Sequence, residues 1–158
     1  MAPIVAGMSG TPELHQITPE NVGAAVRIEV KPEQGAFVAP VVYSLAEAYA
    51  QHHVAWPRLV QDGGQAVAFV MGAFDPAAEP DFFRCGIWRL NVGAEHQGKG
   101  YGRFAVESVL DEGRRRGQVR ATVLWVPGEA GPEGFWRHMG FQPTGEDFHG
   151  QLVGERYL

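Results

Sequence analysis

The chain has no sequence feature of a disulfide-bonded, membrane-spanning or secreted protein. Its 158 residues include a single cysteine, Cys85, so no disulfide forms within the chain, which fits a reducing compartment. No stretch approaches the ~20 apolar residues of a membrane-spanning helix. Residues 1–10 have neither a basic start nor a long apolar run, so they do not resemble a signal peptide. We therefore expect a cytoplasmic protein that does not bind a membrane.

Basic residues are also scarce. The chain has 13 Lys and Arg against 18 Asp and Glu, a net charge of −5, which excludes the basic surface of a nucleic-acid-binding protein. An acidic chain can attract a cationic small molecule. The histidines show no metal-ligand spacing, so no metal site is expected. With 45% hydrophobic residues, residues 1–158 should form one domain, with a poorly ordered segment at 1–10.

Hydrophobic periodicity predicts a chain of mixed strands and helices. Strands are expected at 14–17, 66–74, 82–92, 121–126, 141–146 and 151–157, and helices at 18–30, 44–53, 100–116 and 132–139. Asp62-Gly63-Gly64 predicts a tight hairpin turn. Simple alternation in the strand 82–92 would place Trp88, Leu90 and Val92 on one face, and Ile87, Arg89 and Asn91 on the other.

Two helix starts and two helix ends have local signals. Thr18 precedes Pro19 as an N-cap would, and Ser44 with Glu47 three residues later has the pattern of a capping box. Gly117 is expected to end the long helix 100–116. Gly140 followed by Phe141 has the pattern of a glycine C-cap with its hydrophobic contact.

The most informative segment is Gln97-Gly98-Lys99-Gly100-Tyr101-Gly102, between a predicted strand and the long helix. Glycine permits positive φ angles and close approach of a ligand. The first turn of a helix offers unpaired N–H groups and a partial positive charge, and Lys99 and Arg103 add full charges. This combination predicts a site for a phosphate or pyrophosphate.

Two well-known nucleotide motifs do not fit this loop. The dinucleotide fingerprint needs a glycine where Arg103 stands. The phosphate loop of NTPases fits at Gly93, Gly98 and Lys99, but it needs Ser or Thr for Mg²⁺ where this chain has Gly100. The phosphate-bearing ligand is therefore of another kind.

Gln97, Gly100 and Gly102 form the pattern Gln-x-x-Gly-x-Gly, which resembles the pyrophosphate loop of the GNAT acetyltransferases. Gly140-Phe141 after a short helix also matches that family, and the resemblance covers roughly residues 14–157. Short segments at 37–40, 44–49, 88–90 and 97–102 look like bacterial spermine/spermidine acetyltransferases. The resemblance implies an α/β (α+β) fold: a mixed, mostly antiparallel sheet with helices on both faces and a central strand–helix–strand unit for acetyl-CoA.

The resemblance implies that the protein transfers the acetyl group of acetyl-CoA to a primary amine of a small molecule, with a polyamine such as spermidine or spermine as the leading acceptor. The alternatives are a protein N-terminus, a lysine or an antibiotic amine as acceptor, and a CoA-binding regulator without turnover. Members of the superfamily are often dimers, so a homodimer is a possible assembly by analogy.

Acetyl-CoA is expected to contact one strand, the glycine loop and the last helix. The expected residues are Leu90, Asn91, Val92, Gln97, Gly98, Lys99, Gly100, Tyr101, Gly102, Arg103, Phe135 and Trp136. Leu90 to Val92 would hold the pantetheine arm through backbone groups, and the Val92 N–H would stabilise the thioester oxyanion.

Trp136 stands where many family members have the tyrosine that protonates the CoA sulfur, and an indole cannot give up that proton. Glu129, Tyr157 and solvent are the alternatives. His138 lies two residues beyond Trp136 and is expected to point elsewhere. For a cationic acceptor, the expected binding residues are Glu95, Arg89 and Glu47.

Overall fold

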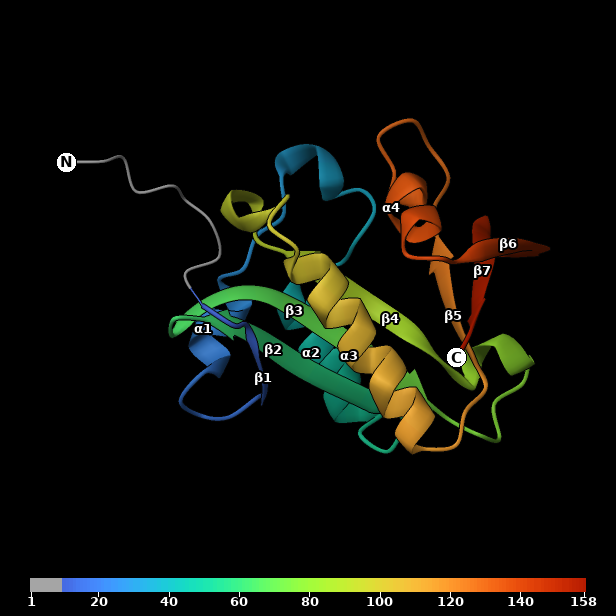
Figure 1. Ribbon diagram of the computed structural model, residues 1–158, viewed down its shortest axis with the longest axis horizontal. Helices are drawn as coiled ribbons and strands as arrows, with labels where there is room; N and C mark the ends of the chain where they lie inside the picture. The colour runs from blue at the N-terminus through green and yellow to red at the C-terminus, as the bar shows by residue number, and fades with distance from the viewer. Residues whose placement is uncertain (1–9) are drawn as a thin grey trace.

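The computed structural model describes residues 10–158 (Figure 1), so the segment expected to be poorly ordered lies, apart from Gly10, outside the described residues. The centre of the fold is a seven-stranded sheet in the order β1-β2-β3-β4-β5-β7-β6. The strands are β1 (Glu13–Gln16), β2 (Ala55–Asp62), β3 (Gln65–Phe74), β4 (Cys85–Val92), β5 (Arg120–Trp125), β6 (Gln142–Phe148) and β7 (Gln151–Tyr157). Only β4 and β5 are parallel among these described strands. The predicted mixed, mostly antiparallel sheet is confirmed.

Helices cover both faces of this sheet. They are α1 (Val22–Val26), α2 (Val41–Ala50), α3 (Tyr101–Arg115) and α4 (Glu133–His138). In Figure 1, α3 crosses the near face of the sheet and α2 lies behind it. Val70 of β3 belongs to one buried cluster with Val109 of α3, whereas its neighbour Phe69 belongs to a second cluster with Val41 of α2. No helix within residues 10–158 is long and apolar enough to cross a membrane.

The first two helices do not begin where their capping signals predicted. Thr18 forms a turn before α1: its N–H donates to Asn21 Oδ1 at 2.8 Å, and its hydroxyl accepts from the Asn21 N–H at 3.3 Å. The helix α2 starts at Val41, directly after Pro40, so the buried Ser44 lies inside it and is not a cap. Val41 is buried at this start, and packing of the apolar first turn outweighs the local capping signal.

A β-bulge at Trp88 overturns the predicted alternation along β4. The register with β3 pairs Ile87 with Gly72 and Arg89 with Met71, so Trp88 has no partner residue. One extra residue shifts every later side chain to the other face of the sheet. Ile87, Leu90 and Val92 therefore pack toward α3, while Trp88 and Arg89 lie on the α2 side.

The sheet opens between β4 and β5. Their parallel pairing comprises Gly86 with Thr122 and Ile87 with Val123, and the ladder does not continue beyond these residues. Gly86 makes this junction possible, because a Cβ there would lie 2.2 Å from the Thr122 carbonyl oxygen. The two strands therefore meet at one end and separate toward their carboxyl ends, which is where ligands of parallel strands bind.

Candidate active site

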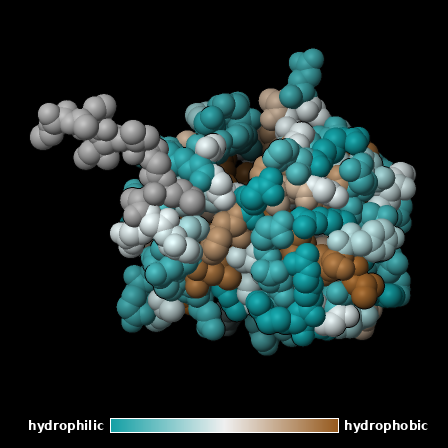
Figure 2. Space-filling view, viewed as in Figure 1, coloured by the Kyte–Doolittle hydropathy of each residue, from teal (hydrophilic) through white to brown (hydrophobic). Residues whose placement is uncertain are grey.

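A pocket of about 960 Å³ occupies the opening between β4 and β5. Its walls come from the loop before α2 (residues 35–40), the last residues of β4, the glycine loop, the end of β5, and α4. Figure 2 shows a recess with hydrophobic surface inside it, between two hydrophilic projections. Segments more than 100 residues apart in the sequence thus surround one cavity.

The glycine loop forms an open cradle at one end of this pocket. Gly98 and Gly100 have φ angles of +75° and +90°, which L-residues rarely adopt. A Cβ at either position would meet no atom within 4 Å, so the space beside the loop is free. Gly100 is also the N-cap of α3 and makes no side-chain capping bond. The first N–H groups of α3 are therefore available to an anion, and Arg103 of this first turn lines the pocket.

Gln97 holds the cradle in place. Its side-chain amide donates to the Val92 carbonyl oxygen at 3.0 Å and to Gln34 Oε1 at 2.7 Å. The Gln34 amide donates back to Gln97 Oε1 at 3.1 Å. Because these bonds use its side chain, Gln97 ties the loop to the end of β4 and to the Pro32–Gln34 turn. Its expected part in cofactor binding is thus to position the loop.

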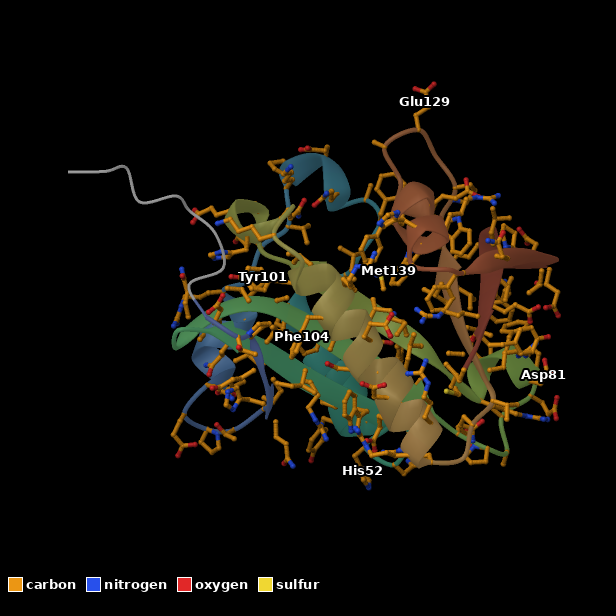
Figure 3. All side chains as sticks on the ribbon, in the orientation of Figure 1. His52, Asp81, Tyr101, Phe104, Glu129 and Met139 are labelled. Atoms are coloured by element: carbon orange, nitrogen blue, oxygen red, sulfur yellow. The ribbon has the colours of Figure 1, made fainter. Side chains whose placement is uncertain are left out.

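Tyr101 contributes its backbone to the cradle, while its ring points into the core (Figure 3). Its hydroxyl donates to Asp62 Oδ2 at the end of β2 over 2.5 Å. This hydrogen bond, followed by burial and the charge of Asp62, raises the pKa of Tyr101 to about 12. The start of α3 is thereby fastened to β2. Lys99 does not line the pocket, so Arg103 carries the positive charge beside the cradle.

We expect Tyr101→Phe to lower the free energy of unfolding by about 1–3 kcal/mol, because the buried Asp62 carboxylate would lose its donor. The raised pKa gives a second signature. Tyr101 stabilises the fold fully below its ordinary pKa of 10, and this contribution disappears as the pH rises through about 12. Urea denaturation should therefore show the difference between wild type and variant shrinking between these pH values. A difference that stays constant would contradict the assignment.

The residues of β4 do not all reach the pocket. Leu90 and Val92, which are predicted to bind the pantetheine arm, line it. Asn91 is 2% exposed and faces away, and its amide donates to the Ala39 carbonyl oxygen at 3.0 Å. Asn91 therefore holds the 35–40 loop against the sheet and does not line the cofactor pocket. Asn91 thus supports the 35–40 wall of the pocket from outside the cavity.

Other predicted site residues also lie away from the pocket. Glu129 is exposed at the tip of the loop before α4 and points outward (Figure 3). Tyr157 is 71% exposed and pairs with Arg120, at the opposite end of β5 from the pocket. Neither side chain lines the pocket between β4 and β5, so the catalytic roles expected for them stay predictions without support from the pocket geometry. Glu95 lines a separate hollow of about 470 Å³ beside α1.

The α4 wall combines one expected and one unexpected feature. Trp136 is buried, and its ring packs edge-on against Phe135 at 5.0 Å and Phe141 at 5.6 Å between centroids. Trp136 and Phe135, both predicted to contact acetyl-CoA, line the pocket. His138 lines it as well, although the sequence suggested that it points elsewhere. Residues of α4 that are two positions apart therefore both reach the pocket.

Trp125 at the end of β5 is a site residue that the sequence did not reveal. It lines the pocket, and its buried indole Nε1 finds no hydrogen-bond partner among residues 10–158. The far edge of the ring lies over Gly154 of β7, where a Cβ would come within 2.4 Å of it. A buried N–H without a partner is costly unless a ligand or water accepts from it. The sequence signal that could have identified Trp125 as a site residue was its position at the carboxyl end of a predicted parallel strand, where ligands bind.

Comparison with known proteins supports the architecture. The model of the Acetyltransferase (GNAT) family matches residues 24–141. The chain belongs to this GNAT family. Among curated proteins, N-acetyltransferase 8 of Rattus norvegicus is 33% identical over 92 residues, which are 57% of this chain and 40% of that protein. This GNAT chain therefore matches less than half the length of its curated relative.

Solved structures share the fold at low identity. An acetyltransferase from Thermus thermophilus superposes with a TM-score of 0.74 and 20% identity, covering 94% of this chain and 97% of that one. PaiA N-acetyltransferase from Thermoplasma acidophilum, solved in complex with coenzyme A, gives a TM-score of 0.64 and 11% identity, covering 94% and 100%. The closer resemblance of this GNAT protein to spermine/spermidine acetyltransferases stays a prediction.

Proposed function

We propose that this GNAT protein transfers an acetyl group from acetyl-CoA to a primary amine of a small molecule. The observation that carries the proposal is the pocket at the split between β4 and β5, with a glycine cradle at the start of α3. Family membership supports the same chemistry. PaiA, which shares the fold, was solved with coenzyme A.

The pocket fits acetyl-CoA in three places. The free space beside Gly98 and Gly100, with the Arg103 guanidinium nearby, suits the pyrophosphate. The β5-facing edge of β4 after Ile87 has no strand partner in the described chain, so its backbone can bond the amides of the pantetheine arm. The unpaired N–H of Trp125, without a partner among residues 10–158, can donate to an oxygen of the cofactor.

Acetyl-CoA supplies the activated acetyl group, and the residues of the chain provide binding and proton exchange. Val92 lines the pocket, and we keep its backbone N–H as the proposed donor to the oxyanion. The indole of Trp136 cannot give up a proton to the CoA sulfur. Among the described lining side chains, the imidazoles of His96 and His138 can exchange a proton with a ligand. We propose His138 on α4, near Trp136, for this role in place of Glu129 and Tyr157.

The lining of the pocket is not built for a polycation. None of the described residues that line it is Asp or Glu. A polyamine would therefore bring several positive charges into a cavity without a carboxylate to pair with them. A polyamine acceptor stays a prediction from the sequence, and nothing in the described pocket supports it.

A thiol-release assay tests the proposal. The protein is incubated with acetyl-CoA and a panel of amines, amino acids and polyamines, and free CoA is titrated with a thiol reagent. We expect release that depends on the acceptor and that is lost in Gly100→Val. Clear binding of acetyl-CoA without release for any acceptor would favour a non-catalytic CoA-binding regulator and overturn the enzymatic proposal.

A further inference from the structure

The charges inside the pocket have one sign. The chain carries 18 acidic residues, yet the described lining contains no Asp or Glu. Its charged side chains are Arg89 and Arg103, accompanied by His96 and His138. The charged side chains that line the cavity are therefore basic, although the protein as a whole is acidic.

The two arginines lie on different sides of the sheet opening. Arg103 belongs to the first turn of α3, beside the glycine cradle, so the cofactor phosphates account for it. Arg89 is turned to the α2 side by the bulge at Trp88, away from the cradle. The cofactor phosphates therefore do not account for Arg89, and the acceptor is the remaining ligand of the pocket.

Arg89 is held in a defined orientation. Its Nη1 donates to the Trp88 carbonyl oxygen at 3.0 Å, and its Nη2 donates to Glu47 Oε1 at 2.8 Å. Arg89 lines the pocket whereas Glu47 does not, and the paired Arg89 side chain keeps 22% of its surface exposed. A guanidinium has five N–H donors, and these two bonds leave the others for a ligand. Their planar arrangement matches a carboxylate.

The wall around Arg89 is apolar. Trp88, the bulged residue, lies on the same side as Arg89, with the Arg89 guanidinium 5.7 Å from its ring centroid, and Phe37 of the 35–40 loop also lines the pocket. The Phe37 ring packs on the loop before α4, where Gly131 leaves room: a Cβ there would lie 3.1 Å from the ring. Aromatic residues and a fixed guanidinium in the lining of one pocket suit a ligand with one apolar group and one anionic group.

We infer that the acceptor amine also carries a carboxylate, as an apolar amino acid does, and that Arg89 binds this carboxylate. The inference rests on the proposed acetyltransferase function and names the acceptor class. The amine nitrogen forms the new bond to the acetyl carbon, the C–S bond breaks, the thiolate leaves as CoA, and the amine proton passes to solvent or an imidazole. Arg89 takes no part in these steps beyond placing the acceptor.

Matched acceptor pairs test the inference. Phenylalanine and phenethylamine differ by the carboxylate alone, and spermidine represents the polycation. We expect kcat/KM for phenylalanine to exceed that for phenethylamine about 10-fold or more, the gain from charge-assisted hydrogen bonds. Equal or faster turnover of phenethylamine or spermidine would overturn the inference and leave the acetyltransferase function standing.

Variants of the Arg89–Glu47 pair separate recognition from structure. In Arg89→Gln the preference for phenylalanine should fall toward one. In Glu47→Gln it should persist or rise, because Arg89 is freed from a competing carboxylate. A merely structural ion pair would instead make both variants lose activity toward both acceptors equally, which would refute the assignment. Arg103→Gln is the control: it should weaken acetyl-CoA binding and leave the preference unchanged.

A binding measurement keeps the two proposals distinguishable. Calorimetric titration of phenylalanine and phenethylamine into the protein with CoA present does not need turnover. If no acceptor releases thiol, the acetyltransferase proposal fails, and tighter binding of phenylalanine that is lost in Arg89→Gln still supports the carboxylate site. Equal binding of the two ligands would overturn it.

Discussion

Gly100→Val is expected to lower the affinity for acetyl-CoA about 100-fold or more, the loss of one or two charge-assisted hydrogen bonds to the pyrophosphate. Gly100 has a φ of +90° and faces open space, where the pyrophosphate is proposed to lie. A branched side chain there fills this space and covers the first N–H groups of α3. It also strains the backbone, because a β-branched residue rarely adopts positive φ. Isothermal titration calorimetry measures the change.

Gly117→Val is the matched control for backbone strain. Gly117 has a φ of +79°, also faces open space, and lies just beyond the other end of α3, outside the pocket. Both variants should lose similar stability in urea, and only Gly100→Val should lose affinity. A folded Gly100→Val protein that binds acetyl-CoA as tightly as wild type would show that the pyrophosphate lies elsewhere.

Gly86→Ala is expected to cause the largest loss of stability, about 3 kcal/mol or more, as in severe overpacking. The added Cβ would lie 2.2 Å from the Thr122 carbonyl oxygen and 2.9 Å from its Oγ1. The Thr122 carbonyl oxygen belongs to the backbone, so it cannot move away by a change of rotamer as the end of a long side chain can. The strands β4 and β5 must therefore separate at the junction that sets the opening of the pocket. Equilibrium urea denaturation measures the loss.

Gly134→Ala serves as the control for this substitution. Gly134 lies in α4, and a Cβ there would meet no atom within 4 Å. Alanine is favoured over glycine in a helix by up to about 1 kcal/mol, so this variant should be neutral or slightly more stable. If Gly86→Ala is equally harmless, the junction between β4 and β5 is looser than the structure indicates.

Patterns of neighbouring residues predicted much of the fold and the glycine cradle of the site. The glycine cradle, the start of α3 and the hairpin at Asp62-Gly63-Gly64 were predicted from the sequence, because each depends on neighbouring residues and their φ angles. The end of α4 was also predicted: Gly140 has a φ of +91°, and the Phe141 N–H donates to the Trp136 carbonyl oxygen at 3.0 Å. Such local signals survive without knowledge of the tertiary structure.

The part of the pocket around Arg89, where the acceptor is proposed to bind, depends on contacts between residues far apart in the sequence. Sequence patterns could not predict those contacts. The predicted roles of Glu129 and Tyr157 assumed that loops and strand ends reach the reacting atoms, and the structure places both outside the pocket. Glu47 had the spacing of a capping box, but α2 begins earlier, and Glu47 pairs with Arg89 instead. A salt bridge across 42 residues leaves no pattern along the chain.

The sequence by itself thus determined where an anionic cofactor is expected to bind, because consecutive residues from Gln97 to Arg103 form that cradle. Only the tertiary structure decided what the rest of the pocket presents. A single bulged residue, Trp88, turns Arg89 toward α2, and the pairing of β4 with β3 decides which side chains face the cavity. The position of Arg89 in the described pocket therefore follows from strand register, and the charged residues that line this pocket are basic in a chain of net charge −5.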